Sequence, residues 1–263
     1  MTLDIHSQTD NSKRITDLAQ RGSNIGSYGL KGVQYAAHRG LSKIAPENTL
    51  PAFIHAGNAG FWGAETDVQL SLDGEWVLMH DATVDRTTNG TGAVDSLTLA
   101  QLKILDAGSW FSDYYVDARV PTLLEYLQTC KRAGLIPVPE IKTGTYSDTD
   151  LQYFIDQCLS VFGDYQFTIL SANQGIVGQL RDLDKRVTIE YVVGAYTEAL
   201  VDFCVTVGNC WLGAEYTTIP SDVIYATSRG VQIVAFTVND PDNIVDMINA
   251  GVRQITTDYI NLP

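Results

Sequence analysis

The sequence predicts an α/β fold, namely a (β/α)8 barrel of the TIM type with a small insertion after the third strand. From residue 33 onward, short β-rich runs alternate with longer helical patterns. The runs are apolar without alternation, which is typical of parallel strands covered by helices. About eight strand–helix units in roughly 230 residues match the size of such a barrel. A doubly wound sheet is disfavoured, because the first run ends in HRG with no glycine-rich phosphate turn after it.

Nine strand-like runs compete for the eight strand positions of a barrel. One candidate for the surplus is the stretch 63–81, where SLDGE alone links two runs and leaves no room for a helix. The other candidate is the terminal run. In chain order the runs are 33–39, 63–70, 76–81, 136–142, 167–172, 187–193, 209–214, 231–238 and 253–257.

Helical patterns fill most intervals between these runs, and several carry residues that favour helix starts and ends. The predicted helices are 48–59, 97–104, 121–133, 148–161, 174–183, 197–207, 221–229 and 241–250. The start residues are Pro46 with Glu47, Pro121 with Thr122, Asp148, and Asp240 with Pro241, and the end residues are Gly134, Gly230 and Gly251.

The domain organisation follows from composition. No Pro- or Gly-rich linker divides residues 33–263, so we expect one barrel domain there. Within it, residues 82–120 are less regular and rich in Thr, Gly and Asp, which predicts an insertion over the barrel mouth. Residues 1–32 are polar and predict either an N-terminal tail or a segment that attaches the domain to a larger assembly.

The chain is strongly acidic. Its 263 residues contain 17 Lys and Arg against 31 Asp and Glu, a formal net charge of −14. Such a surface repels phosphate backbones and anionic headgroups, so we expect neither a nucleic-acid partner nor a polybasic membrane anchor. An anionic substrate must therefore be held by a few placed cations, by a metal ion, or by both.

Residues 1–30 lack the apolar core of a signal peptide, and no apolar run approaches the ~20 residues that span a bilayer. We therefore expect a cytoplasmic protein without a transmembrane segment, and the number of chains in its assembly stays open. The four cysteines form no C-x-x-C pair, which predicts free and mostly buried thiols. They are Cys130, Cys158, Cys204 and Cys210.

Polar residues gather at the carboxyl ends of the predicted strands, where barrel enzymes carry their active sites. Histidines, carboxylates and cations therefore converge on one mouth. In chain order they are His38 and Arg39, Glu65 and Asp67, His80 and Asp81, and Glu140 and Lys142. The remaining strand ends carry Ser171, Glu190, Glu215, Asn239 and Asp258.

The carboxylates predict a metal site. Glu65 and Asp67 lie two residues apart on a strand and face the same side, and Glu140 and Lys142 repeat this spacing. Carboxylates inside a barrel are costly unless they pair with cations or bind a metal. Three carboxylates without a Cys ligand suit Mg²⁺ or Ca²⁺ better than zinc. The alternative is a salt-bridge network with Arg39 and Lys142.

Histidine is the side chain best suited to proton transfer near neutral pH. The chain has four, of which His6 lies in the tail and His55 within a predicted helix, where a surface or packing role is expected. His38 and His80 both end strands beside the carboxylates, which indicates acid–base catalysis. Two proton carriers, a metal and anion-binding cations together indicate cleavage of a phosphoester.

The motifs HRG with PENT, E-x-D, HD and E-I-K follow one another in this order. Together they closely resemble the motifs of the glycerophosphodiester phosphodiesterase family, and the resemblance covers about residues 33 to 263. The segments that carry it are AAHRGLSKIAPENTLPAF (36–53), GAETDVQLSLDGEWVLMHD (63–81), TTNGTG (87–92), AGSWF (107–111), VPTLLEYL (120–127), PVPEIK (137–142), AFTVND (235–240) and ITTDYI (255–260).

The resemblance implies a barrel that uses one divalent cation to hydrolyse a glycerophosphodiester to glycerol 3-phosphate and an alcohol. Glu65, Asp67 and Glu140 match the family's metal ligands. His38 and His80 match the acid–base pair, with His38 as the proton acceptor and His80 as the donor to the leaving alcohol. The other matches are Arg39 and Lys142 as phosphate contacts, Glu47 and Asn48 at the edge of the site, and Asp81 as a support for His80.

Three positions depart from the family's pattern. Phe236 stands where the family usually has Trp, Ala172 stands where a Phe follows the serine, and the closing TDYP is TDYI here. The metal and histidine positions are untouched, so the departures bear on the preference for the leaving group and not on the chemistry.

Three alternative functions stay open. In the first, the substrate is polymeric, such as a poly(glycerol phosphate) teichoic acid, and the N-terminal segment attaches the domain to an assembly such as a phage tail. In the second, the protein is a lipid phosphodiesterase of the lysophospholipase D kind, for which Trp110, Phe111, Tyr114 and Tyr115 would supply an apolar rim unless they pack the insertion. The third, a non-catalytic binding module, is disfavoured because every expected catalytic residue is present.

Overall fold

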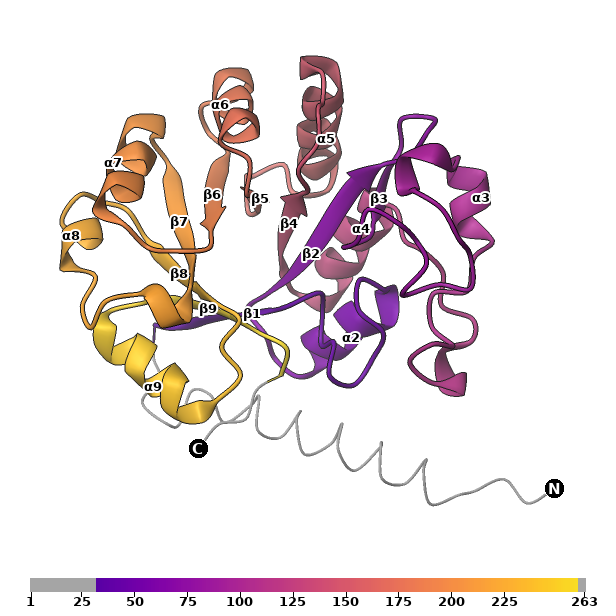
Figure 1. The fold of residues 1–263 in the computed structure, drawn as a ribbon, viewed down its shortest axis with the longest axis horizontal. Helices are drawn as coiled ribbons and strands as arrows, with labels where there is room; N and C mark the ends of the chain where they lie inside the picture. Colours follow the sequence, from indigo (N-terminus) through magenta and orange to yellow (C-terminus); the bar gives the residue numbers. More distant parts are fainter. Residues whose placement is uncertain (1–31, 260–263) are drawn as a thin grey trace.

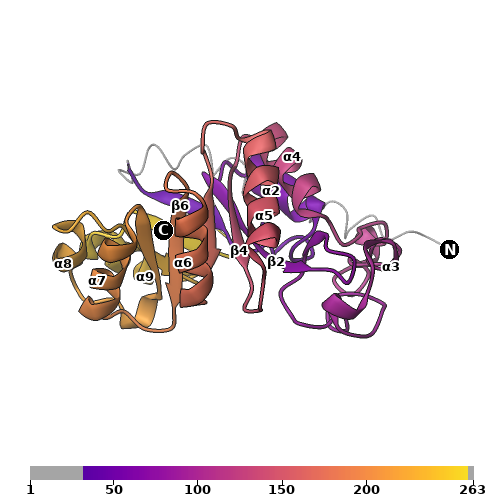
Figure 2. The same ribbon diagram turned by 90° about the horizontal axis from the view of Figure 1, so that it is seen from above.

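The computed structural model describes residues 32–259, which form a closed barrel of eight parallel strands with helices around its outside (Figures 1 and 2). The pairing of β1 with β2 closes the ring, and the predicted fold class is confirmed. The ring consists, in spatial order, of β1 (Gln34–Ala37), β9 (Gln254–Thr257), β8 (Ile233–Phe236), β7 (Cys210–Glu215), β6 (Thr188–Val193), β5 (Thr168–Ser171), β4 (Ile136–Ile141) and β2 (Gly63–Leu70).

The surplus strand is the second half of the stretch 63–81. β3 (Trp76–Leu78) pairs antiparallel with β2, so the short SLDGE link makes a hairpin on the outside of the ring. The terminal run is a ring strand, since β9 pairs in parallel with both β1 and β8. First and last strands of the described chain are therefore neighbours, which brings their carboxyl ends together.

The helices lie between the strands as predicted, with two differences in length. Capping boxes at Thr122 and Ser147 fix the starts of α4 and α5. The predicted helices 97–104 and 221–229 are shorter than expected, and the N-cap residue of α8, Val223, makes no side-chain cap. The helices are α2 (Leu50–Asn58), α3 (Leu99–Lys103), α4 (Leu123–Ala133), α5 (Asp148–Val161), α6 (Gln174–Leu183), α7 (Glu198–Val207), α8 (Ile224–Thr227) and α9 (Pro241–Ala250).

The insertion between β3 and α4 has a small apolar cluster of its own. It contains the 3₁₀ turns η1 (Val94–Ser96) and η2 (Asp113–Tyr115) besides α3. Val84, Val94 and Leu102 pack there against buried side chains next to β3, separately from the main core between barrel and helices. The insertion is thus anchored beside the barrel end at which β3 terminates.

Three further predictions concern the chain as a whole. All four cysteines are free and buried, as expected. Within residues 32–259, no helix combines the length and the apolar composition that crossing a bilayer requires. The predicted N-terminal tail or attachment segment, apart from Gly32, lies outside the described residues.

Candidate active site

One cavity of about 310 Å³ brings together the polar residues predicted from the strand ends. His38 and Arg39 follow β1, His80 follows β3, and Lys142 follows β4 directly. Glu65 and Asp67 lie in β2 and Glu140 in β4, where the strand register pairs Asp67 with Glu140. All seven side chains line the cavity. The parallel ring gathers six of them, and the antiparallel hairpin brings His80 back beside β2, where the N–H of Met79 donates to the Asp67 carbonyl at 3.0 Å.

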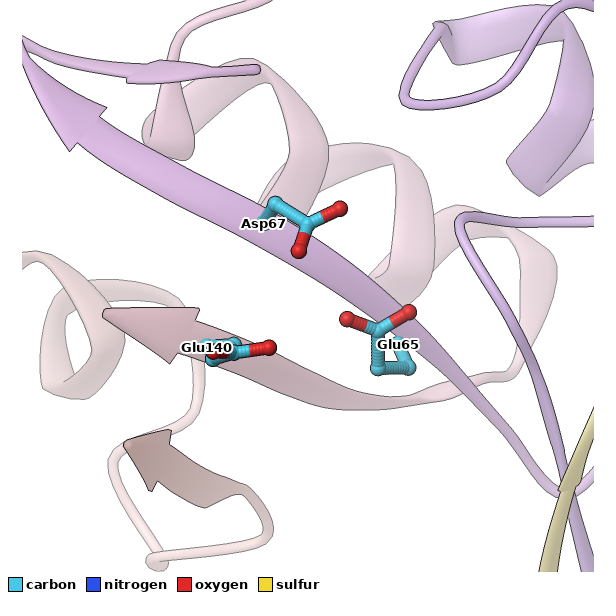
Figure 3. A group of neighbouring side chains, drawn as sticks. All are labelled: Glu65, Asp67 and Glu140. Carbon is cyan, nitrogen blue, oxygen red and sulfur yellow. The ribbon is translucent and has the colours of Figure 1, made fainter. Parts of the chain in front are cut away.

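Three carboxylates meet in this cavity. Glu65 and Asp67 extend from the same face of β2 toward Glu140 on β4 (Figure 3). Each offers an oxygen, and these oxygens lie within 4.8 Å of one another. Burial and the charge of Asp67 raise the pKa of Glu65 to about 8, and burial also raises the pKa of Glu140. Crowded and desolvated carboxylates of this kind fit a hard divalent cation, because its charge offsets their repulsion.

The two predicted cations pair with Asp67. Lys142 Nζ lies 3.1 Å from Asp67 Oδ1 and 3.3 Å from Glu140 Oε1, and Arg39 Nε lies 3.4 Å from Asp67 Oδ2. Burial opposes ionisation of Asp67, but Lys142 and Arg39 outweigh it and lower the pKa of this carboxyl. Glu65 instead accepts only the backbone N–H of Arg39 among the described hydrogen bonds, at 2.8 Å. Salt bridges therefore account for Asp67 and leave Glu65 without a cationic side chain.

Each histidine is held by an aspartate through Nδ1. His38 Nδ1 lies 2.7 Å from Asp258 Oδ1, and His80 Nδ1 lies 2.7 Å from Asp81 Oδ1. When Nδ1–H donates to the carboxylate, Nε2 is the ring nitrogen left for the substrate. Burial lowers the pKa of His38, but the hydrogen bond to Asp258 and the charge of Glu65 raise it above the usual value.

Asn48 and Glu47 hold the edge of the site. The Asn48 amide donates to Asp67 Oδ2 at 2.9 Å and accepts from Thr66 Oγ1 at 2.7 Å. Arg39 and Asn48 both have left-handed backbone conformations, with φ of 57° and 55°. Side chains other than glycine rarely adopt this conformation, and where they do it is often at functional sites. Here it turns the chain sharply after β1, so that the Arg39 N–H reaches Glu65.

Two residues of the site were missed by the sequence reasoning. Asp258 was noted only as a strand end, although ring closure between β1 and β9 places it beside His38. Arg86 was not singled out at all. Its guanidinium contacts Asp81 Oδ2 through Nε at 2.6 Å and Glu47 Oε1 through Nη2 at 2.8 Å. Its place directly before the TTNGTG motif was the available sequence clue.

The four aromatic residues of the insertion do not line this cavity. They pack edge to face against one another instead, and Tyr115 is buried with its hydroxyl donating to the Ile44 carbonyl at 2.9 Å. A packing role therefore holds for Tyr115, whereas Trp110 and Tyr114 are exposed, and none of the four supplies an apolar rim to this cavity.

A barrel whose mouth combines an acidic cluster, two cations and two oriented histidines defines a metal-dependent hydrolase of phosphoesters. The family model of the glycerophosphoryl diester phosphodiesterase family matches residues 38–262. The chain belongs to this family, and it is a glycerophosphodiester phosphodiesterase by function, that is, a phosphoric diester hydrolase.

Relatives across most of the chain agree with this assignment. A glycerophosphodiester phosphodiesterase of Caldanaerobacter subterraneus is 34% identical over 226 residues, which cover 84% of this chain and 92% of the relative. One from Bacillus subtilis is 28% identical over 244 residues, which cover 86% and 83%. A phosphodiesterase structure from Oleispira antarctica, in complex with the product sn-glycerol-3-phosphate, is 30% identical with a TM-score of 0.76 over 86% of this chain and 93% of that chain.

Proposed function

We propose that this cavity cleaves small glycerophosphodiesters to glycerol 3-phosphate and an alcohol, with His38 and His80 as the acid–base pair. The observation that carries the proposal is the pair of histidines, each held at Nδ1 by an aspartate, in one cavity with an acidic cluster and two cations. The product bound in the Oleispira relative supports the same choice of substrate.

Glu65, Asp67 and Glu140 would hold the divalent cation. Their donor set consists of carboxylate oxygens alone, which favours Mg²⁺ or Ca²⁺ over softer metals. The raised pKa of Glu65 supports this choice, because a bound cation supplies the charge that this carboxylate lacks. Bound there, the ion would polarise the phosphoryl group as a Lewis acid and offset its negative charge.

Arg39 and Lys142 bind and orient the phosphodiester. Arg39 presents a planar fork and Lys142 a point charge, and a divalent cation held by Asp67 would leave both free to contact the phosphate. On an acidic chain these two cations make the pocket locally attractive for an anion.

His38 then removes a proton from the nucleophile through Nε2. As the new oxygen–phosphorus bond forms, the bond from phosphorus to the leaving oxygen breaks. His80 gives its Nε2 proton to that oxygen, so a neutral alcohol departs. Developing charge on the equatorial oxygens is stabilised by Arg39 and Lys142. The raised pKa of His38 suits a proton acceptor.

The nucleophile is either water or the neighbouring hydroxyl of the glycerol. Attack by the hydroxyl would form a cyclic glycerol phosphate, which a second step would open. Phosphorus NMR during turnover distinguishes the two routes. A cyclic phosphate that rises and decays at the rate of product formation supports attack by the glycerol hydroxyl. The absence of a cyclic phosphate excludes that route.

A product assay tests the assignment. Glycerophosphocholine, glycerophosphoethanolamine and poly(glycerol phosphate) are offered with EDTA and with restored Mg²⁺ or Ca²⁺. We expect glycerol 3-phosphate from the small substrates, with activity lost in EDTA and restored by one of the two ions. Turnover that survives EDTA would refute the metal site. Preferred cleavage of the polymer would favour the teichoic acid alternative. The cytoplasmic location stays a prediction, which fractionation tests, and light scattering measures the number of chains in the assembly.

A further inference from the structure

A fourth carboxylate, Glu190 on β6, lines the same cavity but stands apart from the metal cluster. Its side chain is 2% exposed, and its Oε2 is buried without a hydrogen-bond partner among the residues that the structure describes. It does not belong to the group of three carboxylates whose oxygens lie within 4.8 Å of one another. A buried carboxyl without a partner is costly, which indicates that a partner arrives from outside the chain.

Gly213 on β7 makes room for this carboxyl. A Cβ at Gly213 would lie 2.2 Å from Glu190 Oε1, closer than any real contact of that kind. Only a residue without a side chain leaves the carboxyl in its place. The sequence therefore supplies both the buried acid and the space for it on neighbouring strands, which are paired in register.

Glu190 lies across the cavity from the phosphate-binding residues. Three strands lie between β6 and β1 in either direction around the ring. β6 is therefore the strand opposite β1, which is followed by His38 and Arg39. Its neighbours on this wall of the cavity are apolar, with Leu170 and Val192 beside it and Phe236 further along. A substrate group that extends from the phosphate toward this wall meets the Glu190 carboxyl beside these apolar side chains.

A hydroxyl is a suitable partner for this buried carboxyl. Burial, together with the charges of Glu65 and Glu140, raises the pKa of Glu190 to about 8. Either protonation state accepts a hydrogen bond from a hydroxyl, and the protonated form can also donate one. Recognition of a hydroxyl therefore does not depend on the charge of this residue.

We propose that Glu190 hydrogen-bonds the terminal hydroxyl of the glycerol that stays on the phosphate, and so selects glycerol phosphodiesters over deoxy analogues. The inference rests on the proposed function, because there His80 protonates the leaving oxygen. His80 follows β3, which lies outside the ring next to β2, so the leaving alcohol departs on that side. His38 follows β1, the neighbour of β2 in the ring, so both histidines lie on the same side of the cavity, and the retained glycerol extends across it toward β6, which carries Glu190 and lies opposite β1.

Two substrates test this role. One is glycerophosphocholine, and the other is the same diester with 1,2-propanediol in place of glycerol, which keeps the neighbouring hydroxyl and lacks the terminal one. We expect the wild type to prefer the glycerol diester by about 10- to 100-fold in kcat/KM, since losing the hydroxyl leaves a buried polar group unpaired. The preference should persist in Glu190→Gln, whose amide also accepts and donates. It should fall toward one in Glu190→Leu.

Gly213→Ala tests the geometry without removing the acid. The new methyl group displaces the carboxyl, so the preference for glycerol should fall, whereas Gly178→Ala, at a position with nothing within 4 Å, should leave it unchanged. A wild type that cleaves both diesters equally would overturn the role of Glu190 while the proposed function stands. A preference for the glycerol diester that survives in both Glu190→Leu and Gly213→Ala would also overturn the role of Glu190 and leave the proposed function standing. Failure of the wild type to cleave either diester would overturn both proposals.

Discussion

The two histidine–aspartate pairs have the same geometry but different surroundings. Both pairs span 2.7 Å between Nδ1 and Oδ1. Asp258 is held by neutral donors, the Asn239 amide at 2.6 Å and the Ser42 hydroxyl at 3.3 Å. Asp81 is held by the guanidinium of Arg86. The first pair is built on adjacent barrel strands, and the second belongs to the hairpin strand and the insertion.

This difference suits opposite directions of proton transfer. With neutral donors, the charge of Asp258 acts on His38 undiminished and raises its pKa, which makes His38 a better proton acceptor. Arg86 lowers the pKa of Asp81 and offsets its charge, so the contribution of Asp81 is mainly to orient the His80 ring. Equal hydrogen-bond lengths therefore do not imply equal roles, because the next neighbour decides how much of the aspartate's charge reaches the ring.

Removing the imidazole rings of His38 and His80 should have the largest effect on kcat. It should also separate the role of the proton acceptor from that of the proton donor. His38→Ala and His80→Ala should each lower kcat for glycerophosphocholine by about 10²- to 10⁴-fold, the usual contribution of general acid–base catalysis. With glycerol p-nitrophenyl phosphate, whose leaving group departs without a proton, His80→Ala should recover most of the loss and His38→Ala should not. Steady-state kinetics on both substrates measure this.

His55→Ala is the control, because His55 lies on α2 away from this cavity and contacts Tyr115. The kcat of His55→Ala should change little on either substrate. If the p-nitrophenyl ester rescues His38→Ala instead, the two histidines have exchanged roles. If neither variant loses activity, the acid–base assignment is wrong.

Replacing the aspartates should have the next largest effect. Asp258→Asn keeps the shape but removes the charge that raises the pKa of His38, so this pKa falls. Because His38 acts in its deprotonated form, the acidic limb of the profile of kcat/KM against pH should move to lower pH. We expect kcat to fall by about 10- to 100-fold, as is common for groups that orient a reacting histidine.

Asp81→Asn provides the matched comparison. Arg86 already offsets the charge of Asp81, so its loss should leave the acidic limb in place and should lower kcat less than Asp258→Asn does. Equal shifts of the acidic limb in both variants would show that neutral and cationic surroundings make no difference to the rings.

The sequence predicted the barrel and the gathering of the seven cavity residues, because strand alternation and carboxyl-end placement are local properties of the chain. Asp258 was within reach of the same reasoning, since a closed ring must pair the first strand with the last. Arg86 was not, because its contact with Glu47 spans 39 positions and depends on how the irregular insertion folds back. The depth of Glu190 likewise depends on Gly213 of another strand, which no local pattern reveals.

Replacing Arg86, whose guanidinium distinguishes the pair of Asp81 and His80 from the other pair, should have the smallest effect. Arg86 is 45% exposed in its side chain, and exposed ion pairs contribute little, so Arg86→Ala should lower kcat for glycerophosphocholine by only about 2- to 5-fold. The loss should vanish with the p-nitrophenyl ester, because Arg86 acts through the proton donor His80. Arg119→Ala is the matched control, since Arg119 lies in the same insertion and donates to the Val116 and Ala118 carbonyls. A rise in KM on both esters, with kcat unchanged, would mean that Arg86 acts through Glu47 and Arg39 on phosphate binding instead.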